Sequence, residues 1–489
     1  MEIYDVFRNY VNALVGRNQE FEELLKNKDI DSVLSYMQCN SDKAVSALRE
    51  YNPETHDITH RADKDSKSKD RNGRKTWKLP IAYQRYINEV SLVFIFGQPV
   101  KWIQQSEGTD NAFIAYNELL KRIRFNSALR ECKRIAGSET ESAMLFRTFR
   151  NDNNKPDVQI RVLAYSKGDK IYTRWDNFEN LLSFAWGYKA KEGNDVVEHL
   201  DIYTSKAIYH CRKLKLGWEV VEEPNIIGKI PVIYFRQEKE WAGAEELINR
   251  EEYIASRTAD TNDYFSDPVA VVNADVVKNM PSKDTVGKLL ITNSQNGVEN
   301  SVKYLTWDNA PASKQQEIEW LQNQILSKTF TPNITLDTLK SLSNLSGKAL
   351  RIVMLLADIK ASKHKETYDE MLDRTASLVT AIIGNVLDIS LKKECDNMII
   401  EHEYQEPFGD DIEGTLNNLV KSVDSGLMST ESAVEMNPLV KDPLKEIDRL
   451  NGESEERRQQ QEDIFGISNP PKKNNEDEDS EDDDENENK

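Results

Sequence analysis

The chain has 489 residues, of which 38% are apolar and 30% are charged, and its formal net charge is −20. This length allows several domains, and the composition is typical of a soluble protein with a polar surface. The longest apolar run, residues 90–96, is far too short to span a bilayer, and the first residues lack the basic start and apolar core of a signal peptide. We therefore expect synthesis in the cytoplasm and no membrane segment.

The four cysteines, Cys39, Cys132, Cys211 and Cys395, lie far apart in the chain and show no CxxC spacing. Cysteines in this pattern are usually free thiols in a reducing compartment. The sequence therefore predicts four buried free thiols and no metal site built from them.

The first third of the chain is predicted to be mainly helical. Residues 1–50 are amphipathic, residues 51–76 are charged and turn-like, and residues 80–100 form an apolar helix that ends near Gly97. Two further helices are expected over residues 111–147. Residues 157–235 then alternate with period two, which predicts an antiparallel sheet.

The middle of the chain predicts two helices separated by a compact β-rich insert. The first helix is indicated by apolar residues from Leu247 to Phe265 at helical spacing, and Asp267-Pro268 ends it. Residues 268–308 have the β-branched and apolar pattern of strands. The second helix presents Ile318, Leu321 and Ile325 on one face.

A polar segment and a very long helix follow this pair. Residues 329–346 are rich in Ser, Thr and Asn, and from Gly347 to about Asp388 only Gly384 interrupts the helical pattern. An unbroken helix of that length spans about 60 Å, whereas helices in globular proteins average about three turns. A helix of this length is typical of a subunit in a large assembly.

The C-terminal part is predicted to be short helices and an acidic tail. Gly426, Pro438 and Pro443 divide residues 411–465. Residues 474–489 carry ten Asp or Glu and one Lys, and such a block repels itself and stays disordered. The expected disordered tail, residues 466–489, either aids solubility or binds a basic partner.

The motifs of common enzyme classes are absent from the sequence. Ser346-Gly347-Lys348 is not a P-loop because Leu342 occupies the position of the first glycine, and no GxGxxG, HExxH or GxSxG occurs. His56 and His60 flank a turn and are predicted to be polar loop histidines. The acidic pairs Glu245-Glu246 and Glu251-Glu252 are predicted to be solvated helix faces. We therefore expect no catalytic residue, no metal and no cofactor.

Five short segments resemble, in the correct order, elements of one protein family. These are Tyr51–Ile58 (YNPETHDI), Leu79–Val100 with its final Gly-Gln-Pro-Val, Tyr203–Tyr209, Gly228–Phe235 (GKIPVIYF) and Asn344–Leu350 (NLSGKAL). The first segment departs from the family's YY-x-G-x-H-x-I pattern because Glu50 stands at the first Tyr and Pro53 or Glu54 at the Gly. On these motifs the chain resembles the bacteriophage portal proteins, specifically the group from long-tailed phages of Gram-positive hosts.

The resemblance implies an α+β, predominantly helical subunit with wing, stem, clip and crown, assembled in a ring that is usually a dodecamer. The implied boundaries are wing 1–237, stem helix 238–266, clip 267–311, stem helix 312–328, tunnel loop 329–346, long wing helix and return strand 347–409, and crown 410–465. The ring would lie at one capsid vertex of the virion, where double-stranded DNA enters and leaves. The implied partners are other copies of the chain, DNA, the terminase large subunit, major capsid and scaffolding proteins, and head–tail connector proteins.

The resemblance places the contacts with DNA in the tunnel loop and the first turn of the long helix. The residues expected to face DNA are Lys340, Ser341, Ser343, Asn344, Lys348 and Arg351. The hydroxyl and amide groups among them can donate hydrogen bonds to phosphate oxygens without reading sequence. A surface loop is the alternative for residues 329–346. For Lys348 and Arg351, whose charge opposes the helix dipole, the alternative is pairing with a neighbouring subunit.

The clip is expected to dock the terminase motor and later the connector proteins. Its lysines Lys278, Lys283 and Lys288 either take part in that docking and face DNA or are simply solvated. Two other classes of protein remain open from the sequence alone. One is a metal-dependent nucleic-acid-processing enzyme, whose carboxylates would have to converge in the fold, and the other is a non-viral oligomeric scaffold.

Overall fold

The computed structural model contains both helices and strands in two compact units, residues 1–407 and 408–489. The structure describes residues 20–63, 76–215, 217–266, 269–273, 288–292, 303–304, 311–334, 347–405, 412–440 and 443–464. The acidic tail and most of the predicted clip and tunnel loop therefore lie outside the described residues. Each unit is considered by itself.

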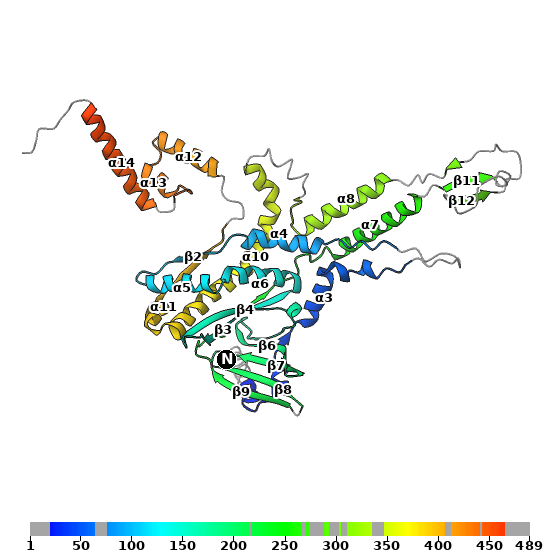
Figure 1. Cartoon of the computed structure of the whole chain (residues 1–489), viewed down its shortest axis with the longest axis horizontal. Helices are drawn as coiled ribbons and strands as arrows, with labels where there is room; N and C mark the ends of the chain where they lie inside the picture. The colour runs from blue at the N-terminus through cyan, green and yellow to red at the C-terminus, as the bar shows by residue number, and fades with distance from the viewer. Residues whose placement is uncertain are drawn as a thin grey trace, which may run out of the picture. The chain divides into compact units, whose positions relative to one another are not determined.

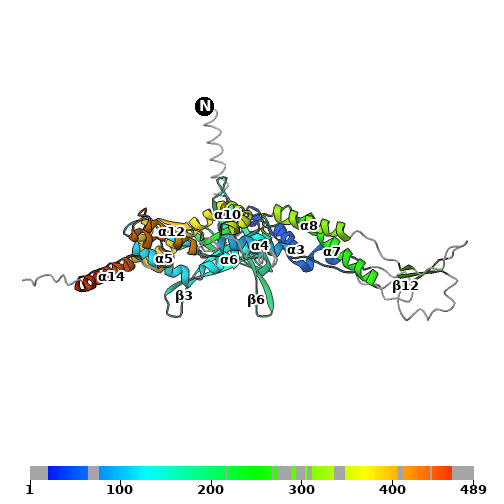
Figure 2. The same cartoon turned by 90° about the horizontal axis from the view of Figure 1, so that it is seen from above.

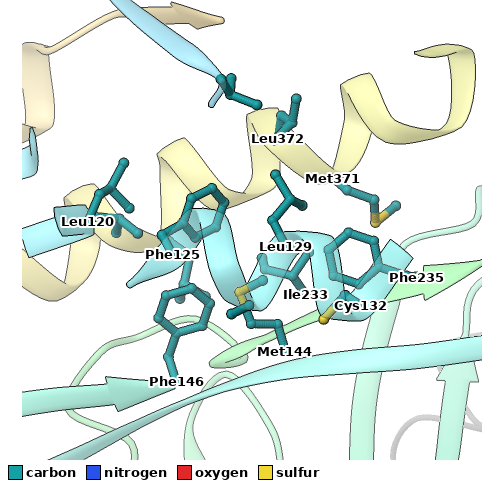
Figure 3. Packing of buried hydrophobic residues seen from close by; sticks show 14 of the residues in the cluster. Leu120, Phe125, Leu129, Cys132, Met144, Phe146, Ile233, Phe235, Met371 and Leu372 are labelled. Atoms are coloured by element: carbon teal, nitrogen blue, oxygen red, sulfur yellow. The ribbon is translucent and has the colours of Figure 1, made fainter. Parts of the chain in front are cut away.

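The core of the first unit is built around helix α6 (Phe125–Glu139). A three-stranded antiparallel sheet in the order β10-β3-β4 packs against it, and the long helix α10 (Gly347–Ile382) contributes Met371 and Leu372 to the same cluster. The strands are β3 (Glu141–Arg150), β4 (Pro156–Leu163) and β10 (Val232–Arg236). Figure 3 shows Phe125, Leu129 and Cys132 of α6 among side chains from these strands and α10. Their spacing of four and three residues places all three on one helix face.

A second, six-stranded antiparallel sheet follows the order β1-β5-β6-β7-β8-β9. Its strands are β1 (Gln38–Cys39), β5 (Lys170–Trp175), β6 (Leu181–Glu192), β7 (Asp195–Tyr203), β8 (Ala207–Leu214) and β9 (Gly217–Pro224). Phe21 and Val33, from the helical residues 20–26 and α2 (Ile30–Ser35), pack with Ile202 of this sheet. The predicted antiparallel region 157–235 is thus confirmed, although it divides between two sheets.

Four further elements complete the body of the first unit. They are α3 (Ser41–Tyr51), α4 (Tyr83–Phe96), α5 (Asp110–Arg122) and the two-stranded sheet of β2 (Lys101–Gln104) with β14 (Ile400–Glu403). Helix α4 ends next to Gly97, as predicted, and Ile87, Phe94 and Phe96 are buried on it.

Helices α7 (Glu245–Ser266) and α8 (Pro311–Lys328) form the predicted helix pair. They lie side by side in Figures 1 and 2, and Arg250 of α7 pairs with Glu317 of α8 at 2.9 Å. Helix α7 ends directly before Asp267-Pro268, as expected. The segment between the helices contains β11 (Val269–Asn273), β12 (Lys288–Thr292) and β13 (Lys303–Tyr304), with β11 parallel to β12 and antiparallel to β13.

The long helix begins at Gly347, as predicted, and runs as α-helix to Ile382. It then widens into a π-helical turn, Ile383–Leu387, that contains Gly384. A Cβ atom at Gly384 would lie 3.2 Å from both the Cβ of Cys395 and the Cα of Lys392. The glycine therefore permits the close approach of α11 (Lys392–Asn397) to the end of the long helix.

The second unit holds α12 (Ile412–Asp424), α13 (Thr430–Glu435) and α14 (Pro443–Ile464). The Ser429 side chain caps α13 by accepting a hydrogen bond from the backbone of Ser432. The predicted breaks at Gly426 and Pro438 fall between helices. The prediction of short helices is wrong for α14, which has 22 residues and begins at Pro443 rather than being interrupted by it, as expected for proline at a first helical position.

Three other predictions need correction. Helix is wrong for residues 141–147, which belong to β3, and residues 1–50 include the short strand β1. The chain leaves α6 at Thr140, which has the left-handed φ of 68°. Cys39 is exposed rather than buried, whereas Cys132, Cys211 and Cys395 are buried free thiols.

Candidate functional site

The described part of the chain concentrates buried charge where the helix pair α7 and α8 joins α4, α6 and α10. We call this region the joint and define it by two side-chain clusters, one around Glu252 and one around Glu240. Both carboxylates are fully buried. Because buried charges persist only when they are paired and hydrogen-bonded, the partners of these two residues fix how the helices meet.

The first cluster joins α7 to the turn before residue 60. Nδ1 of His56 lies 2.6 Å from Oε1 of Glu252, and Nε2 of His56 lies 2.6 Å from the carbonyl oxygen of Glu50. Both ring nitrogens thus face acceptors, which suits the protonated imidazolium. Burial alone lowers the pKa of His56, but the hydrogen bond and charge of Glu252 and the carbonyl of Glu50 outweigh it, so this pKa is raised.

Glu251 and Glu252 are not solvated, contrary to the sequence prediction, and His56 is not an exposed loop histidine. Their relative exposures are 2%, 0% and 5%. Glu251 accepts hydrogen bonds from the Tyr83 hydroxyl and from Nε2 of Gln322 on α8, both at 3.0 Å. Burial, opposed by these two donors, raises the pKa of Glu251.

The second cluster centres on Glu240, in the connection between β10 and α7. Its carboxylate contacts the ammonium group of Lys133 on α6, the Lys360 ammonium at 2.8 Å and Nε2 of His364 at 3.1 Å, the last two on α10. Gln237 also donates to it, at 2.8 Å. One carboxylate therefore links α6, α10 and the start of the helix pair.

The charges of this cluster shift one another's protonation. Burial favours the neutral acid, but Lys133, His364 and Lys360 together hold the pKa of Glu240 well below its usual range. Burial lowers the pKa of Lys360, and burial also lowers that of His364 against the raising effect of Glu240. At neutral pH the cluster thus contains an ionised Glu240 and an uncharged His364.

A hollow of about 440 Å³ opens beside the second cluster. The connection 237–242, the C-terminal end of α8 with residues 329–330, and the α10 residues 359–367 line it. Its basic residues are Lys239, Lys328, Lys360, Lys363 and His364, and its acidic residues are Glu238 and Glu240. The exposed side chains of Phe330 and Ile359 add an apolar part. Residues 329–330 of this lining are the first two residues of the predicted tunnel loop.

Most of the predicted site residues lie outside the residues that the structure describes. Lys340, Ser341, Ser343 and Asn344, together with Lys278 and Lys283, lie outside the described residues. Lys348 is in the first turn of α10, as predicted, Arg351 is the fifth residue of that helix, and Lys288 is the first residue of β12. That these residues form DNA-contacting and docking sites therefore stays a prediction.

The residues of the joint were not predicted from the sequence, although one signal for them was available. Ile248, Glu251, Glu252 and Ser256 are buried on α7 and follow the spacing i, i+3, i+4 and i+8. That spacing places the two glutamates on the face of the buried Ile248. No comparable signal marks Glu240, because its partners come from α6 and α10, more than 100 positions away in the sequence.

No helix among the described residues is both long and apolar enough to cross a membrane. Within the same part of the chain, no group of three or more His, Cys, Asp or Glu side chains is placed to hold a metal ion.

Comparison with known proteins gives one extensive match. The sequence model of the family described as "Phage portal protein, SPP1 Gp6-like" matches residues 12–460. No curated protein matches significantly. Among solved structures, the chain is similar to one described as "Neck of native GTA particle computed with C12 symmetry", with 8% identity and a TM-score of 0.36, over 81% of this chain and 93% of that chain. A TM-score this low supports no inference about function.

Proposed function

Because this chain belongs to the SPP1 Gp6-like phage portal proteins, we propose that it forms a ring at one capsid vertex. Double-stranded DNA passes through the central hole, first during packaging by the terminase motor and later during ejection. The same ring interacts with major capsid and scaffolding proteins and receives the head–tail connector proteins. The family match over nearly the whole chain is the observation that carries this proposal, and no catalytic role is part of it.

In the proposed subunit, α7 and α8 are the two helices of the stem. The antiparallel sheets and α10 belong to the wing, residues 1–237 and 347–409. The segment 267–311 is the clip that docks the terminase and then the connectors, and residues 410–465 are the crown. The order of elements supports this division, since a helix, a strand-containing segment, a helix and a very long helix follow one another. The origin in a long-tailed phage of a Gram-positive host rests on the sequence motifs alone.

We propose that residues 329–346 line the hole and contact DNA with Lys348 and Arg351. The charge of the chain supports a conduit, because the net charge is −20 and the segment 329–346 carries only one basic residue, Lys340, beside one acidic residue, Asp337. Each neutralised phosphate adds affinity through counterion release, so a hole rich in lysine would hold DNA too tightly to let it move.

The assembly is tested first with the purified full chain. Negative-stain microscopy and mass photometry, at several protein concentrations and salt concentrations, are expected to show rings with a central hole. A species that stays monomeric or dimeric under all these conditions would contradict the portal function. Divalent-metal-dependent turnover of nucleic acid would favour an enzyme instead.

The contact with DNA is tested in assembled rings. Lys340→Glu is expected to spare assembly and to reduce packaged DNA, because every subunit repeats the change and the ring gains a belt of negative charge. That belt acts on phosphates within a Debye length of about 8 Å at physiological salt. Replacing Lys348 and Arg351 by Gln removes charge without reversing it, so a milder loss is expected. Wild-type packaging in all these variants would place the segment away from DNA.

A further inference from the structure

The lysines that line the hollow beside Glu240 differ in how they are neutralised. Lys239 lies 2.5 Å from Glu50 and 2.8 Å from Glu245, so its charge is matched by two carboxylates. Lys328 donates to the carbonyl oxygen of Gly243 at 3.4 Å, and it has no ion pair with a described carboxylate. Lys363 is exposed and likewise has no ion pair within the described part of the chain.

Buried positive charge exceeds buried negative charge around Glu240, which lines the hollow together with Lys360, whereas Lys133 is not one of the lining residues. Lys133 and Lys360 share the single carboxylate of Glu240, and the exposed fractions of these side chains are 0%, 11% and 0%. Two ammonium groups facing one carboxylate leave one positive charge uncompensated. Because uncompensated charge in a poorly solvated place is costly, this arrangement favours an anion in the adjoining space.

The hollow is large enough to admit that anion with its water. Its volume of about 440 Å³ far exceeds the roughly 10–15 Å³ that one water molecule needs on this measure. Lys363 and Lys328 stand on different elements of its wall, α10 and α8, so they can approach one oxyanion from two sides. Glu238 is the only other acid among its described lining residues, and its exposed position leaves its charge screened by solvent.

From this geometry we infer that the hollow is a phosphate-binding site. Lys363 and Lys328 bind the phosphate oxygens from the rim, and Lys360 contributes positive charge from the floor. Lysine ammonium groups bind phosphate as point charges without bidentate geometry, which matches a site formed by separate lysines. All residues of the site belong to one subunit. Phosphate binding therefore does not require an assembled ring that contains DNA.

Inorganic phosphate binding to the full chain tests this site, measured by isothermal titration calorimetry at low ionic strength. Lys363→Gln is expected to raise the Kd for phosphate about tenfold, the loss of one charge-assisted hydrogen bond. The double variant Lys328→Gln/Lys363→Gln is expected to abolish measurable binding. Both lysines are exposed, so circular dichroism of each variant should match the wild type.

The matched control is Lys393→Gln, on an exposed lysine of α11 outside the hollow, which is expected to leave the Kd unchanged. Absence of phosphate binding by the wild type would overturn the proposal. Equal affinity of the wild type and the double variant would overturn it too, because the phosphate would then lie elsewhere.

A competition arm identifies the source of the phosphate group. A short DNA duplex that displaces inorganic phosphate from the wild type, but not in the presence of excess salt, identifies a backbone phosphodiester as the ligand. Retention of phosphate against the duplex identifies free phosphate. Either result supports the site, and they differ only in where its ligand originates.

Discussion

Replacing Glu240 by Gln should destabilise the first unit more than any other single change of charge in the joint. The substitution keeps the size of the side chain and removes its charge, so Lys133 keeps an ammonium group at 0% exposure without a counter-ion. Removing one partner from a buried ion pair costs about 3–5 kcal/mol. Since proteins are typically stable by about 5–15 kcal/mol, the expected loss is roughly a fifth or more of the total.

Urea unfolding of the full chain at pH 7, followed by circular dichroism, measures this loss. The matched control is Glu238→Gln, two residues earlier in the same connection and exposed, where a change within about 0.5 kcal/mol is expected. Both variants must be compared at one protein concentration, because assembly adds stability by mass action. A loss of less than about 1 kcal/mol for Glu240→Gln, after the control, would refute the argument from uncompensated charge.

The same substitution has a pH dependence of known sign. The pKa of Glu240 is depressed in the folded chain from its usual value of 4.5. The carboxylate therefore stabilises the fold fully above the unfolded-state pKa, and this contribution decreases as pH falls through the folded value. The difference in stability between the wild type and Glu240→Gln should be constant near neutrality and shrink below pH 4.5.

Three other outcomes are expected. The pKa of His56 is raised from 6.5, so the stability that the wild type holds over His56→Gln should be complete below pH 6.5 and be lost as pH rises through the folded value, which urea titrations at several pH values measure. Gly384→Ala should cost about 1–3 kcal/mol in the same assay through the approach to Cys395, whereas Gly452→Ala, with no atom within 4 Å of the added Cβ, should not destabilise the chain. Deleting residues 474–489 should leave ring formation intact by mass photometry, because this composition cannot bury a core; loss of assembly would show a structural role for the tail.

The helix pair and the long helix could be predicted because local signals end or begin them. Asp267-Pro268 follows α7 directly, and α10 begins at Gly347. The helix predicted over residues 141–147 is wrong because no comparable local signal marks the end of α6. The chain turns at Thr140 with a φ of 68°, a conformation that β-branched residues rarely adopt. Tertiary packing holds Thr140 in this conformation. The sequence therefore has no glycine at this position that would have indicated the turn.

The buried charges could not be predicted from the sequence because their partners are distant along the chain. A glutamate is assigned to solvent by default, since Glu is almost never fully buried unless it is paired. For Glu252 the pairing group is His56, and for Glu240 it comes from α6 and α10. Helical spacing could have suggested the first pair, but only the fold brings Lys133 and Lys360 to the same carboxylate.

The distribution of these contacts determines where the subunit resists deformation. The pair Arg250–Glu317 along α7 and α8 has exposed fractions of 52% and 41%, and an exposed pair contributes at most about 1 kcal/mol. Glu240, by contrast, connects α6, α10 and the start of α7 from a buried position. Moving the connection that holds Glu240 away from α6 or α10 must expose or separate these charges, so resistance is concentrated at the joint. A force on the far ends of α7 and α8 would therefore bend or shear the helix pair before it displaced the joint.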